Sequence, residues 1–150
     1  MAYNTAKQYS KAEPLFADVL TAEPNNIDIR MTYARVLREQ KKYAPAAQEF
    51  YKVAQAKPDH ADAWSDLAGM LILIENYQGA VAALDKVKEL GAEKAAHHFF
   101  RAIVLDKHKA YEPALASYEK FLSMAEGKHP DEEFKARQRV RIIRKELGKR

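Results

Sequence analysis

Two arginines provide the clearest chemical signal in this chain. Arg35 and Arg38 lie three residues apart in a segment with helical periodicity, so their side chains project from one side of a helix, about one turn apart. Guanidinium groups bind carboxylates and phosphates through paired hydrogen bonds. The pair therefore indicates recognition of an anionic group.

Histidines and acidic residues can support catalysis or bind a metal, but their spacing in this chain argues against an active site and against a metal site. His97 and His98 are adjacent, so they point to different faces of a helix, whereas two metal ligands on one face need a spacing of three or four. Asp131, Glu132 and Glu133 open a predicted helix, where acidic residues are expected. The chain has no cysteine, no glycine-rich phosphate loop and no nucleophile elbow. We expect no enzyme activity, no metal and no cofactor.

Basic residues concentrate at the C-terminal end. Residues 135–150 contain eight basic residues and one acidic residue, whereas residues 1–134 contain 17 basic and 20 acidic residues. A basic helix can bind nucleic acid or an anionic surface by releasing counterions. The residues that would make this contact are Arg137, Arg139, Arg141, Arg144 and Lys145.

Two features of the same helix argue against nucleic acid as the main ligand. The helix lacks the exposed aromatic residues that stack on single strands. Its apolar residues form a narrow stripe, which can be fully covered when the helix caps a larger fold. The stripe consists of Ala136, Val140, Ile143 and Leu147, with Phe134 and Ile142 beside it. Nucleic-acid or anionic-surface binding therefore remains the alternative interpretation.

The chain carries no signal for a membrane or for a particular compartment. No apolar run approaches the ~20 residues of a spanning helix, and the first residues lack the basic end and apolar stretch of a signal peptide. The absence of cysteine fits a reducing or an oxidising compartment. We expect a soluble chain that is cytoplasmic by default, with the periplasm open if a longer parent protein has an upstream signal.

A period of 34 residues organises these features. In each of four frames a helix begins with tyrosine, continues with alanine, and then carries two larger apolar residues. The four sets are Tyr9, Ala12, Phe16 and Val19; Tyr43, Ala46, Phe50 and Val53; Tyr77, Ala80, Leu84 and Val87; and Tyr111, Ala114, Tyr118 and Phe121. This pattern resembles the tetratricopeptide repeat, in which two helices form one unit. The resemblance implies an all-α, right-handed solenoid of about three and a half repeats and a C-terminal capping helix.

The frames predict the boundaries of the units within a single domain. They give a half repeat at 1–24, repeats at 27–60, 61–94 and 95–126, and a capping helix at 131–147. Residues 1–8 are too short for a full first helix, so we expect the first helix to begin near Tyr9. A half repeat leaves the face of Tyr9, Phe16 and Val19 without a neighbour, and such a face can mediate homodimerisation.

The resemblance also implies a binding surface. In this family the first helix of each repeat lines a concave face that holds a peptide or a partner protein. The residues carried over to this face are Met31, Arg35, Arg38, Asp66, Gly69, Ile72, Leu73, Phe99 and Ile103, and in the last repeat also Asp106 and Lys107. One interpretation is an apolar pocket with a basic rim, for a peptide with an apolar anchor and an acidic neighbour.

A second interpretation of these residues stays open. Ile72, Leu73 and Phe99 can simply pack against adjacent helices, while the arginines pair with Glu39 and Asp66. One version of the fold clamps the C-terminal carboxylates of chaperone tails with lysine, asparagine and arginine. The corresponding positions here hold Met31, Arg35, Asp66, Ala96 and Phe100, and the carboxylate of Asp66 would repel such a tail. We expect no chaperone clamp.

Overall fold

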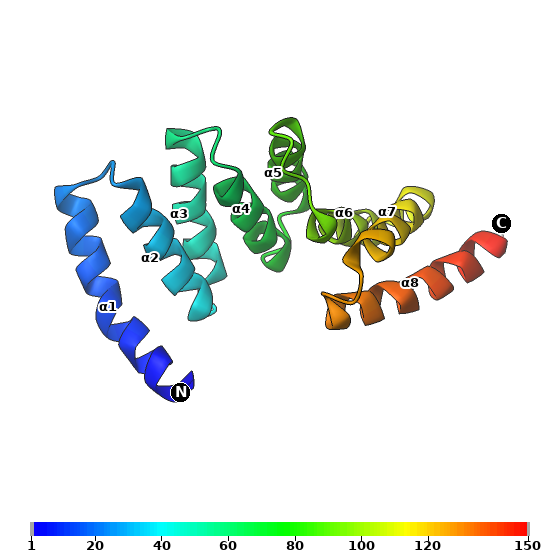
Figure 1. Ribbon diagram of the computed structural model, residues 1–150, viewed down its shortest axis with the longest axis horizontal. Helices are drawn as coiled ribbons and strands as arrows, with labels where there is room; N and C mark the ends of the chain where they lie inside the picture. Colours follow the sequence, from blue (N-terminus) through cyan, green and yellow to red (C-terminus); the bar gives the residue numbers. More distant parts are fainter. Residues whose placement is uncertain (1, 150) are drawn as a thin grey trace. The chain divides into compact units, whose positions relative to one another are not determined.

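The chain folds entirely into helices. The computed structural model describes residues 2–149, and the side chains of residue 8 and of residues 11–149. Within that range the backbone forms eight α-helices and no strand (Figure 1). They are α1 (Ala2–Ala22), α2 (Ile27–Glu39), α3 (Tyr43–Ala56), α4 (Ala61–Leu73), α5 (Tyr77–Glu89), α6 (Ala95–Lys107), α7 (Tyr111–Ala125) and α8 (Pro130–Gly148). The all-α class that the sequence predicts is confirmed.

The 34-residue period reappears in the backbone of the turns. Lys41, Glu75 and Lys109 adopt left-handed conformations with φ of 61°, 62° and 58°. At the first of these turns the N–H of Lys42 donates to the carbonyl of Leu37 at 2.9 Å, which closes the end of α2. Gly91, which follows α5, has φ of 68° in the left-handed region. The same local geometry therefore ends α2, α4 and α6.

The expected start of the first helix is wrong. The sequence predicts a helix from Tyr9, but α1 runs without interruption from Ala2 to Ala22. Residues 2–8 contain two alanines, a lysine and a glutamine, which favour helix, and no glycine or proline to stop it. Pro14 lies inside α1. The side chain of Tyr9 lies outside the described residues, whereas Phe16 is half-buried and its ring centroid lies 6.1 Å from that of Tyr33.

The helices divide into two compact units, each with its own core. Unit 1 extends to Lys86 and contains α1 to α4 and most of α5. Neighbouring helices in the sequence pack against each other, α1 on α2, α2 on α3 and α3 on α4. Alanines at the contacts have no exposed surface, which lets the helix backbones approach closely. These residues are Ala34, Ala46, Ala54, Ala63 and Ala68.

Unit 2 begins at Val87 and contains α6, α7 and α8. Aromatic rings fill its centre: the centroid of Phe99 lies 5.0 Å from that of Phe121 and 6.2 Å from that of Tyr118. The predicted stripe of α8 closes the core, with Ala136, Val140 and Ile143 buried and Leu147 packed against them. None of the described helices is both long and apolar enough to cross a membrane.

Acidic residues fix the start of α8. Asp131, Glu132 and Glu133 stand in its first turn, as the sequence predicts. Glu133 is also buried, and its carboxylate accepts hydrogen bonds from the backbone N–H of Gly127 at 3.1 Å and of His129 at 2.9 Å. These bonds satisfy N–H groups that precede the helix. Glu133 thereby ties the α7–α8 turn to the start of α8.

Candidate protein-binding surfaces

A cleft opens between α6, α7 and α8 within unit 2. Its volume is about 560 Å³. We call it the α6–α8 cleft. The residues that line it are Phe99, Ile103, Asp106, Lys107, Lys109, Tyr111, Tyr118, Lys135, Gln138, Arg139 and Ile142.

A network of hydrogen bonds in the wall of the cleft neutralises its only acidic residue. Arg139 donates to both carboxylate oxygens of Asp106, each at 2.7 Å, and the hydroxyl of Tyr118 donates to the same carboxylate at 2.8 Å. Burial, reinforced by the hydrogen bond to Asp106, raises the pKa of Tyr118. The hydrogen bond to Asp106 also raises the pKa of Arg139. Asp106 therefore presents little net negative charge to a ligand.

The floor and the rim of the cleft differ in chemistry. Ile103 is half-buried, and Ile142 leaves 47% of its surface exposed beside it. At the rim stand three exposed lysines, Lys107, Lys109 and Lys135. In the described part of the chain none of their ammonium groups has a hydrogen bond or an ion pair. The cleft can thus contact an apolar group at its base and negative charges at its edge.

The predicted arginine pair lies in unit 1, where α2 faces α4. Arg38 lies 3.4 Å from one carboxylate oxygen of Asp66, and Arg35 lies 3.7 Å from the other. Arg38 also approaches Glu39 at 3.7 Å. Burial raises the pKa of Asp66, and the charges of Arg38 and Arg35 oppose that rise. The arginines therefore have intramolecular carboxylate partners, as the second interpretation of the sequence expects.

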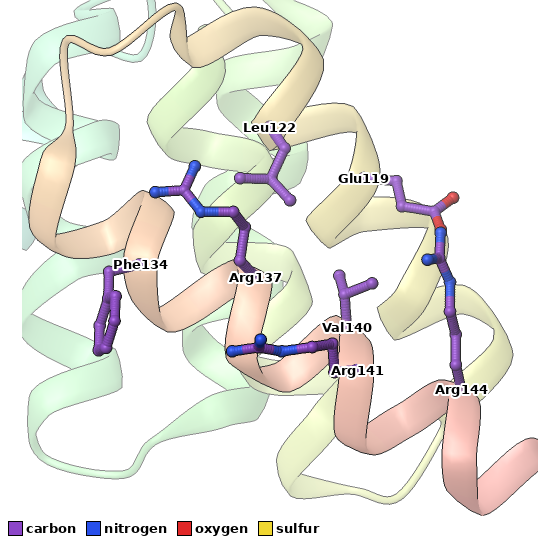
Figure 2. A pocket seen from close by; sticks show the side chains of 7 residues that line it. All are labelled: Glu119, Leu122, Phe134, Arg137, Val140, Arg141 and Arg144. Atoms are coloured by element: carbon purple, nitrogen blue, oxygen red, sulfur yellow. The ribbon is translucent and has the colours of Figure 1, made fainter.

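A second pocket in unit 2 lies between α7 and α8. Its volume is about 470 Å³ (Figure 2). We call it the edge pocket. Glu119 and Leu122 reach it from α7, and the remaining lining residues come from α8. These are Phe134, Arg137, Val140, Arg141 and Arg144.

The five basic residues proposed for nucleic acid do not form one surface. Arg137, Arg141 and Arg144 line the edge pocket, whereas Arg139 lines the α6–α8 cleft, bound to Asp106. Arg144 is paired with Glu119 at 2.6 Å. Lys145 is exposed and lines neither pocket. Arg139 therefore projects away from Arg137 and Arg141, because it lies two residues, about 200° around the helix, from each of them.

The expectation that α8 exposes no aromatic residue is also wrong. Phe134 leaves 57% of its surface exposed at the edge pocket. The apolar stripe that enters the core is occupied by Ala136, Val140 and Ile143. Phe134 precedes Ala136 by two residues and so projects from nearly the opposite side of the helix, which capping the core does not cover.

The two adjacent histidines have structural surroundings. Nδ1 of His97 accepts a hydrogen bond from the N–H of Lys94 at 2.8 Å, at the start of α6. Nε2 of His98 lies 3.8 Å from Glu93. Burial lowers the pKa of both histidines. Among the described residues no group of three histidine or acidic side chains could hold a metal ion.

Comparison with known proteins assigns the fold. Residues 5–87, more than half of the chain, match the family model for "Anaphase-promoting complex, cyclosome, subunit 3", a family of the tetratricopeptide-repeat type. The chain belongs to this tetratricopeptide-repeat family. No curated protein matches the sequence.

Solved structures share the tetratricopeptide-repeat fold with this chain. A crystal structure of MamA matches 97% of this chain and 76% of its own with a TM-score of 0.84 and 21% identity. MamA from Desulfovibrio magneticus RS-1 matches 96% of this chain and 92% of its own, with a TM-score of 0.72 and 15% identity. YrrB, a "TPR protein with an unusual peptide-binding site", matches 85% of this chain and 63% of its own, with a TM-score of 0.68 and 16% identity. At these identities the likeness concerns the fold.

The residues carried over from the tetratricopeptide-repeat pattern fall in both units. Met31, Arg35, Arg38, Asp66, Gly69, Ile72 and Leu73 lie in unit 1, and Phe99 and Ile103 lie in unit 2. Met31 is 5% exposed and Phe99 is 7% exposed, so each contributes mainly to the core of its unit. Gly69 and Ile72 are half-buried, and Leu73 is exposed.

Sequence reasoning missed the part of the α6–α8 cleft that α8 and the preceding turn supply. Asp106 and Lys107 stand at positions that the family pattern implies, but Lys109, Lys135 and Ile142 do not. The sequence predicts α8 as a cap with one buried stripe, and assigns its basic residues only to the alternative nucleic-acid or anionic-surface interpretation. The signal that could have revealed its role was Ile142, an apolar residue next to Ile143 that one narrow stripe cannot bury as well.

Proposed function

We propose that the chain is a non-catalytic protein-binding module whose α6–α8 cleft holds a peptide segment of a partner protein. The observation that carries the proposal is the cleft itself, about 560 Å³ with an apolar floor and three lysines at its rim. A volume in this range suits a ligand-binding site. The segment that fits has an aliphatic or aromatic side chain next to acidic residues.

Charge and burial support this choice of ligand. The ion pair with Arg139 offsets the charge of Asp106, so Lys107, Lys109 and Lys135 determine the local potential. An acidic peptide would gain charge-assisted hydrogen bonds at the rim. Its apolar side chain would cover Ile142, whose exposure in the free protein is unfavourable.

The surface of α2 and α4 is a second proposed contact within the same function. The side chain of Arg35 is half-exposed, and at 3.7 Å its contact with Asp66 is longer than a strong hydrogen bond. A ligand carboxylate could therefore replace Asp66 as its partner. Gly69, Ile72 and Leu73 supply uncharged neighbours on α4.

Capture from a nuclease-treated lysate tests the cleft with three baits. They are the native chain, a Lys107→Glu and Lys135→Glu variant, and an Arg137→Glu and Arg141→Glu variant that carries the same change in net charge. Deletion of α8 is unsuitable as a control, because it would remove Ala136 and Ile143 from the core. We expect a discrete protein bound by the native chain and the arginine variant and lost from the lysine variant. Retention of that protein by the lysine variant would contradict the assignment of the cleft.

Self-association through α1 is a separate proposal. Leu15 and Val19 are exposed large apolar residues on this helix, and a second copy could cover them. Light scattering after size-exclusion chromatography should then show a dimer that Leu15→Glu converts to monomer. A native chain that is monomeric at all tested concentrations would exclude this interface.

A further inference from the structure

The edge pocket and the α6–α8 cleft use different residues of α8. The residues of α8 in the α6–α8 cleft are Lys135, Gln138, Arg139 and Ile142, whereas those in the edge pocket are Phe134, Arg137, Val140, Arg141 and Arg144. With about 100° between successive residues, these two sets project from roughly opposite sides of the helix. A ligand in one site therefore does not occupy the other.

The base of the edge pocket is apolar. Val140 is buried and points toward α7, where Leu122 is half-buried (Figure 2). Phe134 adds an aromatic ring that is more than half exposed. Leu122 and Val140 provide a fixed apolar floor, and Phe134 provides apolar area that only a partner would remove from water.

Arginines give the pocket a positive rim. Arg137 and Arg141 lie one turn apart on α8, and in the described part of the chain neither guanidinium has an ion-pair partner. In Figure 2 both groups lie apart from Arg144, which reaches Glu119 on α7. Three arginines and one glutamate give the lining a formal charge of +2. The free guanidiniums are placed to bind carboxylates.

We propose that the edge pocket binds an amphipathic helix of a partner protein, with acidic residues flanking its apolar stripe. The walls are two packed helices, α7 and α8, and a third helix packs naturally into the groove between two others. Residues 134–144 of α8 span about 15 Å, which matches roughly three turns of a partner helix. Apolar residues on successive turns of that helix would meet Leu122, Val140 and Phe134.

The lining favours such a helix over nucleic acid. Glu119 places a carboxylate in the wall and already holds Arg144 at 2.6 Å, so it disfavours a phosphate chain. Two free guanidiniums and one exposed aromatic ring make a small surface for a polyanion, which binds through many distributed contacts. An acidic amphipathic helix uses both the charges and the apolar floor.

Selection from a displayed library of helical peptides, panned against the full chain, tests the proposal. Enriched peptides are synthesised with a fluorescent label, and their affinity is measured by anisotropy for four variants. Arg137→Glu with Arg141→Glu changes the rim of the edge pocket, and Phe134→Ala removes its ring. Lys107→Glu with Lys135→Glu and Ile142→Ala are the matched changes in the α6–α8 cleft. Circular dichroism verifies that each variant is folded.

The proposal expects an enriched class of peptides with apolar residues on one helical stripe and acidic residues beside it. Their affinity should fall about tenfold or more with the arginine changes and with Phe134→Ala, and change less than about twofold with the cleft variants. The proposal is overturned if no such class is enriched, or if the enriched peptides lose affinity only with the cleft variants. It is equally overturned if a labelled oligothymidylate, and no peptide, binds through Arg137 and Arg141 with a steep salt dependence. Because the lysine variant reports on the cleft alone, failure here leaves the proposed function standing.

Discussion

Replacing Asp106 by alanine should destabilise unit 2 by about 2–4 kcal/mol, because its carboxylate, on a side chain that is 11% exposed, binds two neighbouring side chains. Asp106 accepts from Arg139 twice and from Tyr118 once. Tyr118 is only 3% exposed, so its hydroxyl would be left buried without a partner, at a cost of about 1–3 kcal/mol. The side chain of Arg139 is 37% exposed and can turn toward water, so losing its ion pair costs about 1 kcal/mol.

A double-mutant cycle isolates the buried hydroxyl. Tyr118→Phe alone should cost about 0.5–1.5 kcal/mol. In the Asp106→Ala background the same change should be neutral or stabilising, because it removes the unpaired group, which gives a coupling of about 1 kcal/mol or more. Glu119→Ala is the control, since its pair with Arg144 is exposed and should contribute less than about 1 kcal/mol.

Urea unfolding followed by far-UV circular dichroism measures these differences. Native-state hydrogen exchange of the amides in α6, α7 and α8 assigns them to unit 2. If Asp106→Ala costs no more than Glu119→Ala, the hydrogen bonds do not hold α8 against α6 and α7. Additive effects of Asp106→Ala and Tyr118→Phe would show that the hydroxyl does not depend on the carboxylate.

Four further outcomes follow from the described contacts. Phe121→Ala should cost about 3–5 kcal/mol in urea unfolding, because this side chain is fully buried in unit 2; a cost near that of a surface change would contradict the core assignment. Gly91→Ala should lower stability by about 1 kcal/mol through its left-handed φ of 68°, since nothing lies within 4 Å of an added Cβ; an unchanged melting temperature would refute this strain. Burial lowers the pKa of His97, so the unfolded chain takes up the proton first and stability should fall below about pH 6.5. His97→Asn, which can still accept from the helix start, should reduce that loss, and an identical pH profile would reject the explanation. A free Glu-Glu-Val-Asp peptide should not be clamped at the surface of α2 and α4, because the carboxylate of Asp66 already pairs with Arg38 and would repel the tail; a micromolar affinity by calorimetry that the Lys107→Glu and Lys135→Glu variant retains would disprove it.

The periodic part of the fold could be predicted from the sequence because it depends on local signals. Tyrosines at 34-residue intervals mark the first residues of α3, α5 and α7, and the alanine three residues later is buried in each. These residue types specify where helices begin and which face they bury. The start of α1 was not predictable from the frame, because residues 2–8 follow their own helix propensity and not the repeat.

The candidate sites were less predictable because they depend on which neighbour each side chain meets. Arg139 reads as one more basic residue of a charged helix, yet Asp106, 33 residues earlier, holds it by two hydrogen bonds. Phe134 reads as a neighbour of the buried stripe, yet 57% of its surface is exposed. Lys41 and Lys109 adopt the left-handed conformation although neither is a glycine, so their residue types do not predict it. Periodicity specifies the buried face of α8, whereas the roles of its other two sides follow only from tertiary contacts.

The three-sided character of α8 has a consequence for how this segment can vary. Insertion or deletion of one residue between Pro130 and Phe134 would rotate everything after it by about 100°. The stripe of Ala136, Val140 and Ile143 would then leave the core, and the lysine and arginine sets would turn away from their pockets together. Changes in length should therefore be tolerated poorly inside α8, so homologous chains should differ in side chains along this helix before they differ in its residue count.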